Sequence, residues 1–154
     1  MKLSLDKARQ ELKRADHLIF VSLKYTRTVD VIKNVIERLI NAYDFAIEAL
    51  FRYAKLKNMV DEFPTAAIVR AEKIKEIFSD DTEIFNYISL YLLFRKLNKA
   101  KFNRALEYRR HVTMTAYLDE GEVEVSIDII SEYFEKTKEF VDYCHALIEG
   151  KQND

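Results

Sequence analysis

Apolar residues recur every three or four positions through most of this chain, which is the period of an amphipathic helix. The clearest stretch lies between residues 29 and 54 and continues for about seven helical turns opposite a charged face. Its apolar stripe consists of Val29, Ile32, Ile36, Ile40, Tyr43, Ile47, Leu50 and Ala54. Because Val35, Leu39 and Phe51 widen this stripe, we expect the helix to lie centrally in a bundle.

The same period predicts a helix on either side of this central one. The first helix is expected to begin after Ser4 as its N-cap, with Asp6 in its first turn, and to end at a turn over residues 26–28. Its apolar stripe consists of Leu5, Ala8, Leu12, Ala15, Ile19 and Ser22. A break at residues 61–64, which contain the only Pro, precedes a helix over about 65–78.

A further helix is expected to start within residues 79–83, with Asp80 as its N-cap and Glu83 three residues later, as in a capping box. It contains a core stripe of Ile84, Ile88, Tyr91 and Leu92. The pattern leaves open whether this helix runs unbroken to His111 or kinks near Asn98.

The pattern changes after His111, where β-branched and aromatic residues become frequent. Residues 111–118 and 123–127 predict a short β-hairpin or an extended loop that packs on the bundle. Asp128 can then cap the last helix, and Gly150 is placed to end it. The sequence therefore predicts an all-α, up-and-down bundle of about five helices, with this hairpin or loop before the last one.

Composition agrees with one folded domain over residues 1–154. The chain is 49 % apolar and 33 % charged and contains only two Gly, as expected for long helices with few loops. No apolar run approaches the ~20 residues of a membrane span, and the charged N-terminus does not resemble a signal peptide. We expect a cytoplasmic protein that does not enter a membrane.

Charge is distributed unevenly along the chain, although the formal net charge is −1. Residues 95–111 hold seven Lys or Arg and one acidic residue, whereas residues 119–154 hold three Lys and eleven acidic residues. A basic stripe is typical of a nucleic-acid-binding surface. Alternatively, the two segments neutralise each other within the fold or across a dimer.

Arg104 and His111 are the candidate catalytic residues of the basic segment. If the segment is helical, their spacing of seven residues puts them on one face. An Arg that stabilises phosphoryl charge beside a His that transfers protons suits metal-free phosphodiester chemistry. Candidate nucleic-acid contacts around them are Lys101, Tyr108, Arg109 and Arg110. The alternative is a solvated helix end whose cations complement the helix dipole.

Other chemistry finds little support in the sequence. Neither a metal-ligand cluster nor a glycine-rich phosphate loop is present, so we predict no metal and no cofactor. The lone Cys144 fits the buried stripe of the last helix. Tyr87, Tyr91 and Phe94 are expected in the core or at a dimer interface, with a base-stacking platform as the alternative.

The order of these parts resembles the HEPN family (higher eukaryotes and prokaryotes nucleotide-binding domain). These small helical bundles carry an Arg-x(4–6)-His motif late in the chain, before an irregular segment and one final amphipathic helix. Here Arg104-ALEYRR-His111 matches that spacing, and VTMTAYLDEGEVEVSID leads into the last helix. The stretch AYDFAIEALFRYA in the central helix also looks like a family feature.

The resemblance implies a homodimer in which Arg104 and His111 line a shared cleft that cuts RNA without metal. Catalytic members usually have a polar residue directly after the Arg, and here that residue is Ala105. The string RALEYRR is also similar to non-catalytic members that pair with nucleotidyltransferases. We therefore rank a module that binds a partner protein, nucleotide or RNA, as in a toxin–antitoxin pair, slightly above the ribonuclease. A purely structural bundle is the third alternative, and it predicts that Arg104 pairs with an acidic side chain of its own chain.

Overall fold

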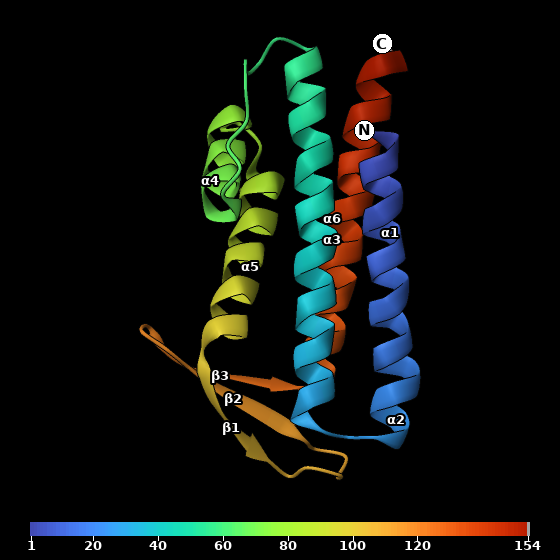
Figure 1. Ribbon diagram of the computed structural model, residues 1–154, viewed down its shortest axis with the longest axis vertical. Coiled ribbons are helices and arrows are strands. Elements are labelled where there is room, and N and C mark those ends of the chain that lie inside the picture. The colour runs from blue at the N-terminus through green and yellow to red at the C-terminus, as the bar shows by residue number, and fades with distance from the viewer. Residues whose placement is uncertain (154) are drawn as a thin grey trace.

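The computed structural model describes residues 1–153, with side chains as far as Gly150, and shows helices standing on a small sheet (Figure 1). The helices are α1 (Lys2–His17), a π-helical turn η1 (Leu18–Ser22), α2 (Leu23–Tyr25), α3 (Val29–Leu56), α4 (Ala67–Ile77), α5 (Thr82–Lys99) and α6 (Ile127–Asn153). The strands are β1 (Lys101–Ala105), β2 (Thr113–Leu118) and β3 (Gly121–Ser126). The predicted helical bundle is confirmed, but the fold is not strictly all-α.

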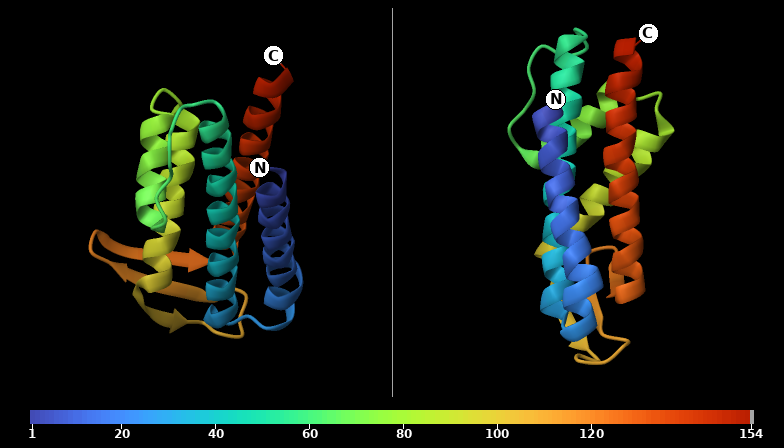
Figure 2. Two further views of the ribbon diagram at one scale, coloured as in Figure 1. Left: turned by 45° about the horizontal axis from the view of Figure 1, so that its top comes forward. Right: turned by 90° about the vertical axis from the view of Figure 1, so that its right-hand side faces the viewer.

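Helix α3 is the central element, as its wide apolar stripe predicts. It packs against α1, α4, α5 and α6, and Val35, Ile36 and Leu39 are among its fully buried residues. The views in Figure 2 show α1 and α6 beside it and the sheet at one end of the bundle. Thr28 begins the helix by accepting a hydrogen bond from the amide of Val31, so the predicted turn at 26–28 is also confirmed.

The sheet contains the predicted hairpin and one strand more. Strands β2 and β3 pair antiparallel over the expected hairpin residues, and β1 pairs antiparallel with the other edge of β2. Met114 and Ala116 of β2 are fully buried against the bundle. A two-stranded hairpin is marginal in water, and the third strand extends the ladder on its open side.

The basic segment is therefore not one helix, and this corrects the shared helix face expected for Arg104 and His111. Helix α5 ends at Lys99, Ala100 is extended, and Arg104 lies in β1. His111 lies in the loop between β1 and β2. Phe102 explains the strand, because it is opposite buried Ala116 and packs against the core from the bundle side of the sheet.

Two cap predictions near the start of helices are wrong. The N-cap of α1 is Met1, whereas Ser4 lies inside the helix and donates its hydroxyl proton to Glu48 at 3.2 Å. Asp81 caps α5 in place of Asp80, and its carboxylate accepts from the amide of Ile84 at 3.1 Å. The Ser4 side chain therefore links α1 to α3 and does not cap a helix, and the cap of α5 lies one residue later than predicted.

The boundaries of α6 also differ from the prediction. Ser126 accepts a hydrogen bond from the amide of Ile129 at 3.3 Å, while Asp128 lies in the first turn, where its charge still favours the helix dipole. Gly150 lies within α6, which continues to Asn153, so it is not the predicted end. Cys144 is fully buried, as expected, and its burial raises the pKa of the thiol.

The aromatic residues of α5 belong to the core. Tyr91 and Phe94 are fully buried beside Tyr43, whose ring stacks on Phe140 with centroids 4.6 Å apart. Tyr87 is half-buried and its ring lies 5.4 Å from that of Phe140. The core interpretation of these residues is therefore confirmed for Tyr91 and Phe94.

The π-helical turn η1 shifts the apolar stripe of the first helix by one position. Ile19 is buried as predicted, but the next buried residue is Leu23 in place of Ser22. A π-turn accommodates one extra residue within a helix. The chain therefore leaves α2 with a different rotation from the one that an unbroken α-helix would give.

The central position of α3 makes its buried leucines costly to truncate. We expect Leu39→Ala to lower the free energy of unfolding by about 2–5 kcal/mol, because it removes apolar contacts and leaves a cavity. Leu3→Ala is the matched control, since the Leu3 side chain is 68 % exposed, and it should change stability by less than about 0.5 kcal/mol. Urea unfolding followed by circular dichroism measures both, and equal effects would contradict the central role of α3.

Candidate nucleic-acid interface

Two loops that are far apart in sequence meet at the sheet end of the molecule. They are the α2–α3 turn (26–28) and the β1–β2 loop (106–112), which lie side by side in Figures 1 and 2. The amide of Tyr108 donates a hydrogen bond to the carbonyl oxygen of Arg27 at 2.6 Å. This bond fixes the two loops relative to each other.

The β1–β2 loop has an unusual backbone for its residues. Leu106 and Tyr108 have φ angles of 56° and 65°, in the left-handed region that non-glycine residues rarely adopt. Such conformations cost of order 1–3 kcal/mol each and persist where surrounding contacts hold them. Here the contacts include the Tyr108–Arg27 bond and a turn in which the amide of Arg109 donates to Leu106. The result is that Tyr108 projects into solvent, 77 % exposed.

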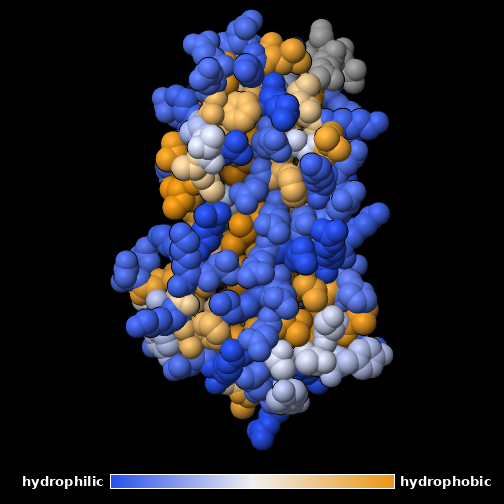
Figure 3. All heavy atoms as spheres, in the orientation of Figure 1, coloured by the Kyte–Doolittle hydropathy of each residue, from blue (hydrophilic) through white to orange (hydrophobic). Residues whose placement is uncertain are grey.

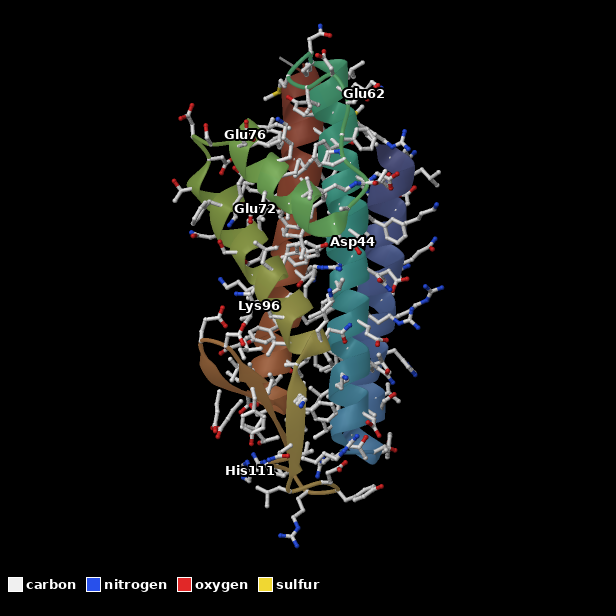
Figure 4. The ribbon with its side chains drawn as sticks, turned by 60° about the vertical axis from the view of Figure 1, so that its left-hand side comes forward. Asp44, Glu62, Glu72, Glu76, Lys96 and His111 are labelled. Atoms are coloured by element: carbon white, nitrogen blue, oxygen red, sulfur yellow. The ribbon has the colours of Figure 1, made fainter. Side chains whose placement is uncertain are left out.

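A cavity of about 350 Å³ opens between these loops and the start of α6. Arg27 lines it from the α2–α3 turn, and Arg110 and His111 line it from the β1–β2 loop. Its remaining lining residues are Thr113, Ser126, Ile127 and Asp128. Figure 4 places His111 at this end of the molecule, beyond the helices.

The charges around the cavity favour an anion. Its lining residues include two arginines, Arg27 and Arg110, and the first turn of α6, where the helix dipole is positive; Asp128 is the single acidic residue among them. Arginine presents a planar set of donors that matches phosphate and carboxylate oxygens. The cavity can therefore hold a phosphate group, with Arg27 and Arg110 as its principal ligands.

Two exposed tyrosines lie close in the chain to the arginines that line the cavity. Tyr25 is 78 % exposed at the end of α2, two residues before Arg27, and Tyr108 precedes Arg110 by two. Figure 3 shows hydrophobic and hydrophilic side chains mixed at this lower end of the molecule. We call the surface formed by Tyr25, Arg27, Tyr108, Arg110 and His111 the basic-aromatic end.

Arg104 takes no part in this cavity. Its guanidinium lies 2.9 Å from the Asp30 carboxylate and 3.8 Å from that of Glu107, and it stacks over the Phe102 ring at 5.1 Å. Glu107 also accepts a hydrogen bond from the amide of Val29 at 3.3 Å. Arg104 therefore joins β1 to the N-terminus of α3.

This pairing matches what the structural alternative predicts for Arg104. The two acidic partners belong to the same chain, and they lie at a helix N-terminus where negative charge is favourable. Arg104 and His111 thus lie in different surroundings within one chain: one in an ion-pair network, the other in the cavity. The structure does not bring them together as a catalytic pair within a single copy.

The other candidate contacts lie around this end without forming one site. Lys101 is exposed on the outer face of β1, opposite Tyr117 in the strand register, and Arg109 is exposed at the loop tip without lining the cavity. Arg110 and Tyr108 belong to the basic-aromatic end. The sequence interpretation missed Tyr25 and Arg27, because only the folded chain shows that their turn contacts the basic segment.

Comparisons with known proteins give no match for this chain. It matches no protein-family model, no curated protein and no solved structure. Among the residues that the structure describes, no helix is long and apolar enough to cross a membrane. Within the same residues, no three His, Cys, Asp or Glu side chains gather as a metal site.

The Arg104–Asp30 pair yields a stability prediction. The pair lies near the surface, where such interactions contribute roughly 0.2–1 kcal/mol. A double-mutant cycle of Arg104→Ala and Asp30→Ala should show a coupling energy of that size in urea unfolding. A cycle of Arg104→Ala with Asp61→Ala, an exposed residue beyond the far end of α3, serves as control and should show none. Strictly additive effects for Arg104 and Asp30 would mean that the ion pair does not hold Arg104.

Proposed function

We propose that this protein binds single-stranded RNA through its basic-aromatic end. The observation that supports this is the convergence of Arg27, Arg110 and His111 from two loops on one cavity, with exposed tyrosines two residues before each arginine. The cavity supplies ligands for a phosphate, and the tyrosines supply faces on which unpaired bases stack.

The expected energetics are those of a modest RNA-binding surface. Each stacked base contributes about 1–3 kcal/mol, and each neutralised phosphate makes the affinity salt-dependent through counterion release. Two tyrosines and two arginines thus form a short binding surface. Lys101 and Arg109, exposed around the same end, extend the positive surface along which a longer strand can lie.

Binding without cleavage is the form of the proposal that the geometry favours. Arg104, the cation that a phosphodiester cleavage site would need beside His111, is held by Asp30 and Glu107. Membership of the HEPN family, a homodimer, and pairing with a nucleotidyltransferase or toxin–antitoxin partner stay predictions from the sequence resemblance.

Fluorescence anisotropy with a labelled single-stranded RNA of about ten nucleotides tests the phosphate contacts. The double variant Arg27→Ala/Arg110→Ala should weaken binding about tenfold or more and reduce the slope of log K against log salt by about 1–2. Lys13→Ala/Lys55→Ala is the charge-matched control, because both lysines are exposed on α1 and α3, outside the basic-aromatic end. It should change the affinity for RNA less than about twofold. Equal losses of affinity in both variants would mean that RNA binds through nonspecific electrostatic attraction and not at the basic-aromatic end.

The aromatic contacts require a variant that keeps the loop backbone. Tyr108→Asn is suitable because Asn tolerates the left-handed conformation, and it is combined with Tyr25→Ala. We expect about tenfold weaker binding with an unchanged salt slope, because stacking is lost while the phosphate contacts remain. Phe85→Ala, at an exposed aromatic residue of α5, is the control and should leave binding unaltered.

The same samples distinguish binding from catalysis. Gel analysis after prolonged incubation without metal should show intact RNA for the wild-type protein. Cleavage that His111→Ala abolishes, with the fold retained by circular dichroism, would replace this proposal with the metal-independent ribonuclease.

A further inference from the structure

A second, larger hollow lies between α5 and α6 and shares no lining residue with the His111 cavity. It has a volume of about 890 Å³ and is open to solvent along its length. Its walls come from residues 83–90 of α5 and 131–139 of α6. At 1.5 Å per residue these stretches are about 10–12 Å long, which corresponds to roughly two turns of a docked helix.

The floor of this groove is apolar and supported from below. Tyr87, Leu90 and Tyr133 line it and are half-buried. The Tyr87 ring packs on Phe140 at 5.4 Å, and the Tyr133 ring packs on Phe94 at 5.0 Å. The floor is therefore anchored to the aromatic core, and a partner that covers it need not reorganise it.

The rim of the groove is strongly acidic. It carries Glu83, Glu132, Glu135 and Glu139 against a single cation, Lys136, which lies 3.6 Å from Glu139. Among the described side chains, no ion pair engages the first three of these glutamates. The rim also affects the floor: the pKa of Tyr87 is raised, first by burial and then by the nearby carboxylates of Glu139 and Glu83.

We propose that this groove binds a basic amphipathic helix of a partner protein. The apolar face of that helix covers Tyr87, Leu90 and Tyr133, and its Lys or Arg side chains pair with the glutamates on the rim. An elongated apolar groove between two helices is the usual acceptor for such a helix, which inserts residues at i, i+3 or i+4, and i+7. Charge complementarity selects a basic helix over an acidic one and accelerates its association.

The same charges disfavour the other occupants. RNA would bring its phosphates against four carboxylates. A second copy docked through a two-fold axis would place this patch against itself and oppose the two acidic rims. The groove and the basic-aromatic end therefore suit partners of opposite charge, so that one chain can hold a basic protein segment and an RNA at once.

Isothermal titration calorimetry of the full chain with a designed peptide tests the proposal. The probe is a 14-residue helix with Leu at i, i+3, i+4 and i+7 and Lys elsewhere, and we expect a dissociation constant of about 10–100 μM. A peptide with the same Leu positions but Glu in place of Lys should not bind measurably. Equal binding of both peptides would overturn the role of the acidic rim.

Charge reversal on the protein locates the site. Glu132→Lys/Glu135→Lys should weaken binding of the Lys peptide at least tenfold. Glu62→Lys/Glu72→Lys is matched in charge, and its two positions lie in the α3–α4 linker and in α4, outside the groove lining (Figure 4), so it should weaken binding less than about threefold. Equal losses in both variants would show attraction to net charge alone and contradict a groove site.

A third variant separates apolar docking from charge. Leu90→Ser keeps every rim charge and should weaken the Lys peptide about tenfold, while near-ultraviolet circular dichroism verifies that the aromatic core is intact. Size-exclusion chromatography with light scattering measures whether the wild-type protein forms a dimer. A wild-type dimer that Glu132→Lys/Glu135→Lys dissociates would make a second copy the occupant and overturn the proposal.

Discussion

The burial of α3 on nearly all sides is the constraint on which the other elements depend. A helix of 28 residues with apolar positions around most of its circumference must be covered, and α1, α4, α5 and α6 cover it. The sheet completes this arrangement at the N-terminal end of α3, where Met114 and Ala116 pack on the bundle and Arg104 bonds to Asp30. The basic-aromatic end is held in position by these same contacts, because its two loops leave directly from α3 and β1.

Periodicity identified the helices well because their buried faces repeat locally. The sequence predicted both the long apolar stripe of α3 and the β-branched hairpin, and each occurs in the structure. Strand β1 was not, since Lys101–Ala105 is too short and polar to signal a strand, and its conformation depends on the free edge of β2. The spacing of Arg104 and His111 suggested one shared helix face. In the structure Arg104 belongs to a strand and His111 to a loop, and the two have different neighbours.

For the candidate site, too, the sequence indicated some residues and could not indicate others. Arg110, His111 and Tyr108 could be singled out because they lie in one basic run. Tyr25 and Arg27 could not, since only the hydrogen bond between the Arg27 carbonyl and Tyr108 reveals that the two loops meet. The sequence showed that positive and negative charge gather in different parts of the chain. The structure shows two surfaces of opposite charge: arginines line a cavity at the sheet, and glutamates line the α5–α6 groove.

The π-helical turn at Leu18–Ser22 sets the rotational phase between the bundle and the basic-aromatic end. Upstream of it, α1 is in register with α3; downstream, Tyr25 faces solvent and Arg27 faces the cavity. An unbroken α-helix through the same residues would turn everything that follows by about 100° further. The core of α1 would keep its register while the tyrosine and the arginine lost their alignment with the β1–β2 loop. The π-helical turn therefore lets the residues before it follow the packing of the bundle while the residues after it follow the position of the β1–β2 loop. A regular helix with a single period would not meet both demands.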